Sequence, residues 1–340
     1  MQFDPPAPSR SPWQLLYGAG HRLRAGWWRS RAEELPRPVI SVGNLHWGGT
    51  SKTPVVAAIA EHLRDSQLEV AVLSRGYHSK GRGVRIISSG EGPLLGPLVG
   101  GDEPVLLAGQ LPGVSVVVGP DRYRAGMHAL ERLNRPPDVF VLDDGFSHLR
   151  LHRDLDVLVF PASDPYGGGR LFPSGRLREP LASLTRAHAV LLTGSRLGLG
   201  AAFAATLTQY GFRGPGFASP TQPLPAETEE GRRLPPGSRV LLVTGIARPE
   251  RVATFAEQAG FEIVDRLRFS DHHLYPAASL RRIEKVWLDS GSDCVLTTAK
   301  DAVKLRGRLD VPMASLGVRT QPEPAFWEWL NRALEPLLVR

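Results

Sequence analysis

Short apolar runs alternate with helical patterns along the first two thirds of the chain. Six of these runs are bounded by turn residues and predict strands at 38–44, 69–74, 114–119, 138–142, 156–161 and 189–193. Between them, apolar residues recur at helical spacing at 53–64, 103–108 and 121–133. This alternation is typical of βαβ units, so we expect an α/β domain with a largely parallel sheet.

A second, smaller set of strands and helices follows a segment of different composition. Residues 211–237 are rich in Gly, Pro, Glu and Thr without periodicity, which is typical of a linker. Beyond it, strands are predicted at 239–244, 262–267 and 294–298, and helices at 249–259 and 276–289. We therefore expect an N-terminal helix region at 1–31, a first domain at 32–212, a linker at 213–237, a smaller C-terminal α/β domain at 238–318 and a C-terminal helix at 319–340.

The N-terminal region has a distinctive pattern of aromatic and basic residues. Apolar residues fall near helical spacing at Trp13, Leu16, Tyr17, Leu23, Trp27 and Trp28, and the other positions carry His21, Arg22, Arg24, Arg29 and Arg31. A short helix of this kind suits an anionic membrane surface. The same pattern also fits a helix packed on the body of the protein, and the segment alone leaves both interpretations open.

Composition narrows the class of protein. The length of 340 residues agrees with two domains, each large enough to bury its own core. Hydrophobic residues are 42% of the chain and charged residues 22%, which excludes an intrinsically disordered chain. No apolar run approaches the roughly 18–20 residues of a spanning helix, which excludes a polytopic membrane protein. The single cysteine, Cys294, excludes an internal disulfide, so we expect a soluble cytosolic protein.

The charge of the chain favours an anionic partner. Its formal net charge is +7, and only five of its 41 basic residues are lysines: Lys52, Lys80, Lys285, Lys300 and Lys304. Nucleic acid, anionic lipid and a phosphorylated substrate all fit such a charge. No basic stretch is interleaved with aromatic residues as in a base-stacking surface, so we expect no nucleic-acid partner.

The first predicted strand leads into a phosphate-binding pattern. Residues 43–54 read GNLHWGGTSKTP and precede a predicted helix, which is the order of a P-loop. In such a loop the glycines let backbone amides surround a phosphate, Lys52 reaches the β- and γ-phosphates, and the Thr53 hydroxyl ligates Mg²⁺. The usual pattern has glycine at positions 46 and 51, where this chain has His46 and Ser51. Ser51 takes up the tight turn less easily than glycine, which is expected to lower the affinity for nucleotide.

Acidic residues stand where they can serve this loop. The strand at 138–142 ends in Asp143 and Asp144, which can hold Mg²⁺ or its waters beside a P-loop. Asp102 and the pair at 272–273 offer a carboxylate and histidines for proton transfer, although, taken alone, a helix start and a surface turn are the preferred explanations. Two further stretches fit phosphate contacts: 170–180, which holds Arg170, Arg176 and Arg178, and 297–304, which fits either a loop over phosphates or a capped helix start.

Taken together, these motifs resemble the tetraacyldisaccharide 4′-kinase family, the lipid A 4′-kinases. The resemblance covers nearly the whole chain in eight segments: 41–54, 73–77, 101–108, 141–148, 171–180, 243–251, 269–273 and 296–304. It implies two α/β/α sandwich domains with largely parallel sheets, joined by a two-stranded linker, with a P-loop NTPase-like N-terminal domain. It also implies that the N-terminal helix region at 1–31 binds the anionic surface of the inner membrane. It also implies transfer of the γ-phosphate of ATP to the 4′-hydroxyl of a tetraacyldisaccharide 1-phosphate, giving lipid IVA, at the cytoplasmic face of the bacterial inner membrane.

The resemblance also implies roles for individual residues. The expected catalytic residues are Asp102 as general base, His272 as its partner, and Lys52. The expected nucleotide-binding residues are His46, Trp47, Gly48, Gly49, Thr50, Ser51, Lys52 and Thr53. The expected substrate contacts are Tyr77, Arg122, His148 and Arg178. The expected magnesium ligands are Thr53, Asp143, Asp144, Glu103 and Glu179.

The chain departs from the family pattern at two positions. Ser51 stands where the family has glycine before the lysine, and Ser147 stands where it has glutamine after Asp-Asp-Gly-Phe. Neither departure removes a charge, so an active kinase is expected. The alternative is a membrane-associated P-loop ATPase that acts as a switch, which has no need of Asp102 and His272; a peripheral membrane scaffold leaves the lysine and aspartate motifs unexplained.

Overall fold

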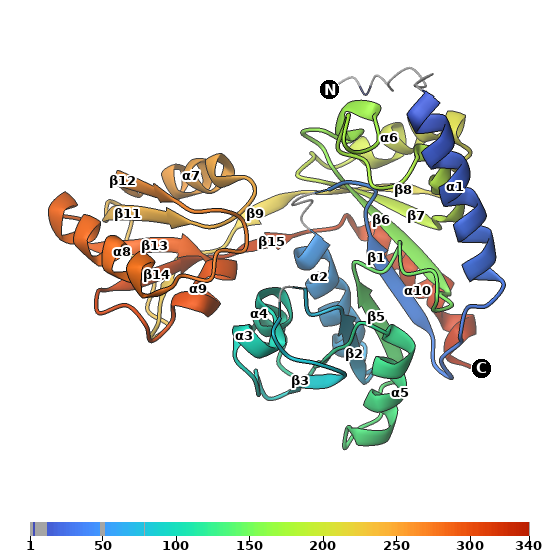
Figure 1. Cartoon of the computed structure of the whole chain (residues 1–340), viewed down its shortest axis with the longest axis horizontal. Coiled ribbons are helices and arrows are strands. Elements are labelled where there is room, and N and C mark those ends of the chain that lie inside the picture. Colours follow the sequence, from blue (N-terminus) through green and yellow to red (C-terminus); the bar gives the residue numbers. More distant parts are fainter. Residues whose placement is uncertain (1–2, 4–11, 48–51, 78, 340) are drawn as a thin grey trace.

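Two open sheets, each covered by helices on both faces, form the framework of the molecule (Figure 1). The structure is a computed structural model that describes residues 3, 12–47, 52–77 and 79–339. The larger unit holds an eight-stranded sheet and the smaller unit a five-stranded sheet, and the two lie at opposite ends of the long axis. The expected fold class, two α/β/α units with largely parallel sheets, is confirmed.

The larger sheet has the strand order β3-β4-β2-β5-β1-β6-β7-β8. Its pairs are parallel except that β3 runs antiparallel to β4 at one edge. Its strands are β1 Val39–Gly43, β2 Val70–Ser74, β3 Arg85–Ser89, β4 Ser115–Val118, β5 Val139–Asp143, β6 Leu155–Pro161, β7 Ala189–Thr193 and β8 Gly216–Ser219. The central strands are buried along their whole length, because both faces of a parallel sheet are covered by helices.

Alternate residues of this sheet pack against different helices. Ile40 and Val42 face a core that includes α2 (Lys52–Asp65), α4 (Asp102–Gln110) and α10 (Pro324–Leu338). The opposite face packs on α5 (Arg122–Arg132) and α6 (Leu199–Leu207). Four short helical segments complete the unit: α3 Pro97–Gly100, η1 Gly167–Gly169, η2 Leu181–Arg186 and η3 Thr208–Tyr210.

The smaller unit repeats the same plan. Its sheet has the order β10-β14-β13-β11-β12, with only β10 antiparallel to its neighbour. The strands are β10 Glu227–Thr228, β11 Arg239–Thr244, β12 Glu262–Arg268, β13 Cys294–Thr298 and β14 Met313–Leu316. Helix α7 (Pro249–Gln258) covers one face, and α8 (Ala277–Ser290) and α9 (Ala299–Leu305) cover the other.

The connection between the units is shorter than predicted. β9 (Thr221–Pro223) pairs with β15 (Val318–Thr320) as a two-stranded antiparallel sheet that runs between the units (Figure 1). The predicted linker of 213–237 is wrong at both ends, because β8 belongs to the larger sheet and β10 to the smaller one. The error has a physical reason: β8 contains Gly216, which lets α6 approach closely, so this buried strand has no apolar alternation to mark it.

Helix α1 (Pro12–Arg29) lies along the outside of the larger unit (Figure 1). One side is tied to that unit: the Tyr17 hydroxyl donates to the Arg178 carbonyl (3.2 Å), and Arg150 stacks over the Trp28 ring. Another side exposes Leu16, Leu23 and Trp27, which are 71%, 77% and 50% accessible. The side chains of Trp13, Arg22 and Arg29 lie outside the described part. Within that part, no helix is long and apolar enough to cross a membrane.

Candidate active site

The predicted site residues gather where β1, β2 and β5 end. In an open α/β sheet, ligands bind beyond the carboxyl ends of the strands. β1 leads to Asn44 and the P-loop segment, β2 ends at Ser74, and β5 ends at Asp143. β1 lies between β5 and β6, so the P-loop segment starts beside the acidic end of β5.

Lys52 opens helix α2 and faces two partners. Its Nζ lies 3.2 Å from Asn44 Oδ1 and 3.4 Å from Asp144 Oδ1. Asp144 has a φ of 56°, a backbone conformation that turns the chain sharply after β5. The Arg178 guanidinium holds the same carboxylate with both terminal nitrogens, at 2.9 and 2.7 Å. Burial would raise the pKa of Asp144, but the Lys52 and Arg178 charges outweigh it and lower the pKa well below its usual range.

Asp143 has a different environment from its neighbour. It is almost fully buried, and one oxygen accepts a hydrogen bond from the Ser74 hydroxyl at 3.2 Å. The other oxygen, Oδ1, is buried without a hydrogen-bond partner in the described part of the chain. Burial raises the pKa of Asp143, and the charges of Glu103 and Asp144 raise it further. The Lys52 charge opposes these effects only in part, and no basic side chain of the described residues forms an ion pair with this carboxylate, which lies where the resemblance implies a metal ion.

The structure covers only part of the predicted P-loop. Gly48, Gly49, Thr50 and Ser51 lie outside the described residues. His46 is buried, which lowers its pKa to about 4 and keeps the ring neutral at physiological pH. Trp47 is half exposed, and its ring lies 6.0 Å from that of Phe172. Thr53 is the second residue of α2, beside Lys52.

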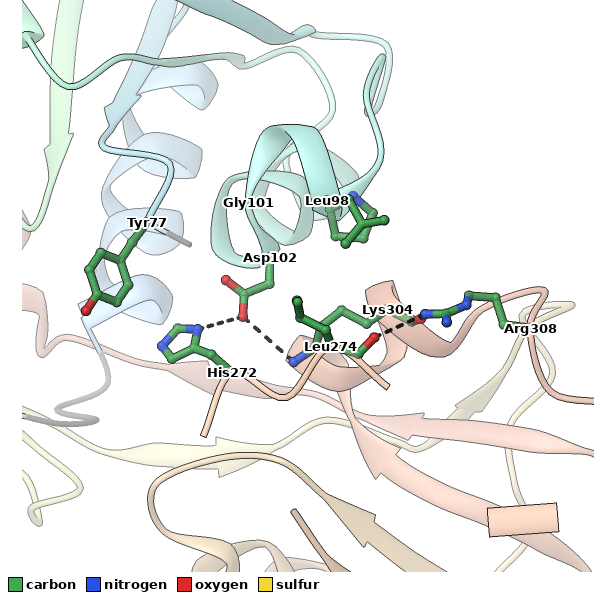
Figure 2. Close-up of a pocket in the computed structure, with 9 residues that line it drawn as sticks. Tyr77, Leu98, Gly101, Asp102, His272, Leu274, Lys304 and Arg308 are labelled. Carbon is green, nitrogen blue, oxygen red and sulfur yellow. Dashed lines mark hydrogen bonds and ion pairs between the residues drawn. The ribbon is translucent and has the colours of Figure 1, made fainter. Parts of the chain in front are cut away.

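Asp102 and His272 meet across the two units. His272 Nδ1 lies 2.9 Å from Asp102 Oδ2, although the residues are 170 positions apart (Figure 2). Asp102 is the first residue of α4 and only 8% exposed; the preceding Gly101 has a φ of 91°, which suits glycine. Burial would raise the pKa of Asp102, but the His272 hydrogen bond and the Lys300 and Lys304 charges lower it to about 2. The carboxylate is therefore ionised at physiological pH.

Two lysines that were not predicted as site residues complete this contact. Lys300 Nζ lies 2.8 Å from Glu103 Oε1 and 3.3 Å from His272 Nε2. Lys304 Nζ lies 3.8 Å from Asp102 Oδ2. Both come from α9, whose N-cap is Thr298, so the capped helix start expected for 297–304 is present. The sequence offered one sign that these lysines belong to the site: two of the five lysines of the chain lie in the single motif at 297–304.

Of the four predicted substrate contacts, only Tyr77 is an exposed side chain beside the Asp102 pocket; the other three are largely buried. Tyr77 is 56% exposed, with its ring 5.8 Å from the His272 ring, and it lines a pocket with Asp102 (Figure 2). Arg178, by contrast, is occupied by Asp144. Arg122 is buried and donates to the carbonyl of Pro120 at 3.1 Å, and burial and the Arg75 charge lower its pKa to about 10. Burial and the Arg122 charge lower the pKa of His148 to about 4.

Glu179 forms a buried ion pair with Arg186. Its carboxylate is 2% exposed and contacts Arg186, the Ser147 hydroxyl and His21, the last at 3.4 Å. Arg186 also lies over the Phe146 ring, so the positive partner is buried as well. Burial would raise the pKa of Glu179, but the His21 hydrogen bond, the Arg186 charge and the Ser147 hydrogen bond lower it to about 2. Ser147, the second departure from the family pattern, is therefore used to hold Glu179.

This environment predicts a structural effect for Glu179→Gln. Breaking a buried ion pair leaves the other charge uncompensated, so we expect the free energy of unfolding to fall by about 3 kcal/mol. The loss should be full above the unfolded pKa of about 4.3, shrink below it, and vanish as pH falls through the folded pKa of about 2, because below that pKa the carboxylate is protonated in both states. Urea unfolding across this pH range measures it.

The matched control is Glu257→Gln. Glu257 pairs with Arg266 at 2.9 Å, but both side chains are about half exposed, so its loss should cost about 1 kcal/mol or less. Unchanged stability of Glu179→Gln together with a raised magnesium requirement would instead make Glu179 a metal ligand.

Comparisons of sequence and structure with known proteins lead to a single family. A family model described as tetraacyldisaccharide-1-P 4′-kinase (LpxK) matches residues 9–335. Relatives named tetraacyldisaccharide 4′-kinase include one from Syntrophus aciditrophicus, 38% identical over 95% of this chain and 94% of its own. Another, from Geobacter metallireducens, is 41% identical over 86% of this chain and 83% of its own. A crystal structure of LpxK from Aquifex aeolicus in complex with ATP matches with a TM-score of 0.75 and 31% identity, covering 96% of this chain and 98% of that one.

Proposed function

The chain belongs to the tetraacyldisaccharide-1-P 4′-kinase family and is an ATP-dependent kinase, and on that premise we propose its substrate and mechanism. It transfers the γ-phosphate of ATP to the 4′-hydroxyl of a tetraacyldisaccharide 1-phosphate, a lipid A precursor, giving lipid IVA. The observation that carries the proposal is the contact, at 2.9 Å, between Asp102 of the unit that also carries Lys52 and His272 of the other unit.

Asp102 serves as the general base in this proposal. A sugar hydroxyl attacks phosphorus only when its proton has an acceptor. A carboxylate with a pKa of about 2 is a weak acceptor, but the loose transition state of phosphoryl transfer needs mainly orientation and charge neutralisation. Asp102 orients the hydroxyl and accepts its proton, and His272 holds Asp102 in place by donating a hydrogen bond from Nδ1.

Lys52 neutralises the phosphates that are transferred. In the described structure its ammonium is shared between Asn44 and Asp144, at 3.2 and 3.4 Å. Both are weak, partly exposed contacts that a nucleotide phosphate, with its greater charge, replaces. Because Arg178 still holds Asp144 at two points, that carboxylate stays in place when Lys52 moves.

The acidic residues fit a magnesium ion. The orphaned oxygen of Asp143 and the raised pKa of that group indicate a place for a cation, and Asp144, Glu103 and the Thr53 hydroxyl are the further candidate ligands. Within the described residues, no three His, Cys, Asp or Glu side chains form a metal cluster by themselves, which agrees with a Mg²⁺ that keeps waters and binds phosphate oxygens. When bound, the ion supplies charge neutralisation of the phosphates. Glu179 is left out of this set because it is only 2% exposed and is enclosed by Arg186, Ser147 and His21, whereas Asp144 and Glu103 are partly accessible.

Three residues are proposed to contact the lipid substrate. The exposed ring of Tyr77 stands beside the Asp102 pocket, where it can stack on a sugar ring. Arg122 and His148 are proposed to contact its polar groups. Arg178 acts through Asp144 instead, since its two terminal nitrogens are bound there.

The proposed location is the cytoplasmic face of the bacterial inner membrane, held by α1. Its exposed stripe of Leu16, Leu23 and Trp27 lies on the side of α1 away from Tyr17, and Arg24 is exposed nearby. Apolar side chains beside arginine suit an anionic bilayer surface, where a helix lies in the interface.

This location predicts that serine at Leu16, Leu23 and Trp27 together weakens binding to anionic vesicles at least about tenfold. Full burial of one such side chain contributes about 1.5–3 kcal/mol, so partial burial of three is enough. Added salt should weaken binding of the unchanged protein as well, because it screens arginine–headgroup attraction. Vesicle flotation measures both, with Leu288→Ser as control, since Leu288 is 69% exposed on the other unit. Equal binding of the triple variant would remove α1 from the membrane contact.

The function is tested by incubating the protein with γ-labelled ATP and a panel of lipid A precursors. Label should appear on the tetraacyldisaccharide 1-phosphate with a free 4′-hydroxyl and not on its 4′-deoxy analogue. Hydrolysis of ATP without labelled lipid would favour the P-loop ATPase switch.

A further inference from the structure

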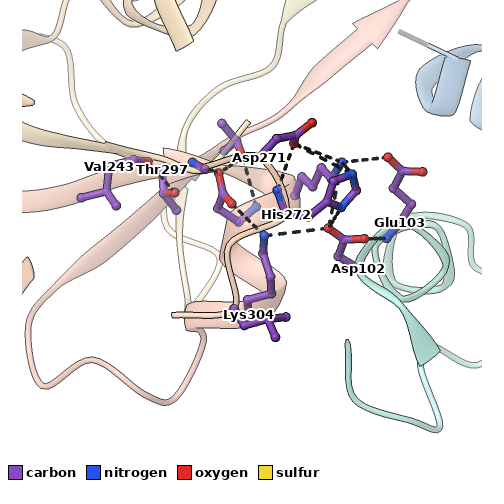
Figure 3. Close-up of polar contacts among 12 residues, drawn as sticks. Asp102, Glu103, Val243, Asp271, His272, Thr297 and Lys304 are labelled. Atoms are coloured by element: carbon purple, nitrogen blue, oxygen red, sulfur yellow. Dashed lines mark hydrogen bonds and ion pairs between the residues drawn. The ribbon is translucent and has the colours of Figure 1, made fainter. Parts of the chain in front are cut away.

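Helix α9 carries two lysines to the boundary between the units. Lys300 and Lys304 stand four positions apart, so they lie on one face of the helix. That face meets the start of α4, where Asp102 and Glu103 are adjacent (Figure 3). The chain has only five lysines, and two of them meet these two carboxylates.

Lys300 links residues of both units at once. Its ammonium donates to Glu103 Oε1 of the larger unit at 2.8 Å and to His272 Nε2 of the smaller unit at 3.3 Å. Because an ammonium has no acceptor, His272 Nε2 must accept, and the proton of the neutral ring then sits on Nδ1. Nδ1 faces Asp102 Oδ2 at 2.9 Å, so Lys300 selects the tautomer that donates to Asp102.

Lys304 is held in place by the buried carboxylate of Asp301 and lies close to Asp102. Its side chain is 4% exposed and lies 3.0 Å from Asp301 Oδ1. Asp301 is fully buried and accepts hydrogen bonds from the Gly245 amide and the Thr298 hydroxyl, both at 2.9 Å. Asp301 is therefore fixed within the smaller unit, and Lys304 carries positive charge from it to within 3.8 Å of Asp102 (Figure 2).

The ion pairs of Lys300 and Lys304 with Asp102 and Glu103 form only when the two units are in contact. A buried ammonium is costly unless carboxylates compensate it. Glu103 of the opposite unit compensates Lys300 at 2.8 Å, whereas Asp301 of its own unit compensates Lys304 and Asp102 adds to it from 3.8 Å. Separation of the units would leave both carboxylates without Lys300 and Lys304.

We propose that Lys300 and Lys304 are positioning residues that hold the two units together around Asp102 and fix His272 against it. The expected effect of the two lysines on kcat rests on the proposed function. Their role in holding the two units together does not. Neither lysine is proposed to touch the substrate; both act through Asp102, Glu103 and His272.

The test is a distance measurement combined with kinetics. Spin labels on Arg132→Cys of α5 and Leu288→Cys of α8 report the separation of the units, since both positions are exposed and the one native cysteine is buried. Lys300→Met should lengthen and broaden the distance distribution and lower kcat about 10- to 100-fold, with KM for ATP unchanged. Lys300→Arg, which keeps the charge, should restore the narrow distribution. Lys285→Met, at an exposed lysine of α8, is the matched control.

Lys304 is tested as a double variant. Lys304→Met alone would leave Asp301 buried without its cation and could unfold the smaller unit, so it is combined with Asp301→Asn. A folded double variant should show the same broadened distribution. Unchanged distances in Lys300→Met and in the double variant overturn the proposal. If Asp102→Asn keeps its kcat while Lys300→Met still separates the units, the assigned base is wrong and the holding role stands.

Discussion

Replacing Lys52 by methionine is expected to lower kcat by at least about 100- to 1,000-fold while the protein stays folded. The ammonium neutralises charge on the transferring phosphates, and groups of this kind contribute about that much to the rate. The fold should survive because Lys52 is partly exposed and its partner Asp144 keeps two hydrogen bonds from Arg178. Lys52→Arg should not rescue the activity, since a planar guanidinium cannot replace a compact ammonium in a tight loop.

Steady-state and single-turnover kinetics measure this effect, with thermal unfolding as the check of the fold. Lys285→Met serves as control, because Lys285 is exposed on α8 in the other unit. A folded Lys52→Met protein with near-normal kcat would contradict the P-loop assignment.

The sequence predicts those elements of the fold that are long, buried apolar segments. It does not predict contacts between segments that are far apart along the chain. Strands buried on both faces, such as β7 and β11, are continuous apolar runs, and their predicted bounds agree with the structure. β8 and β14 are missed because they are only four residues long and rich in small residues. The C-terminal helix was expected, but its packing against the larger unit through Phe326 and Leu330 depends on contacts that no local pattern encodes.

The same limit applies to the candidate site. The P-loop order and the acids after β5 are local patterns, and the structure brings Lys52 to Asp144. The meeting of Asp102 with His272 was implied by the resemblance, since spacing alone cannot relate residues of separate units. The resemblance implies Glu179 as an acidic residue near the metal, but its environment is set by Arg186, seven residues later on η2.

Asp102→Asn and His272→Ala are each expected to lower kcat by about 100- to 1,000-fold, with little change in KM for ATP. General bases contribute about this much, and neither residue is proposed to bind the nucleotide. The double variant should be about as impaired as the worse single variant, because residues that act as one unit lose their function together. Fully additive losses would show that the two act separately, and a large rise in KM for ATP in Asp102→Asn would assign that carboxylate to magnesium.

The pH dependence of kcat separates the two residues. Asp102, with a pKa of about 2, stays ionised across any practical assay range, so it produces no acid limb. The hydrogen bond to Asp102 raises the pKa of His272 above its ordinary 6.5, although burial and the Lys300 charge oppose the shift. A protonated His272 cannot accept from Lys300, and its positive charge makes Asp102 a weaker acceptor of the hydroxyl proton, so kcat should fall as pH falls through this raised pKa. The limb should be absent in His272→Ala, and its persistence there would mean that another group titrates.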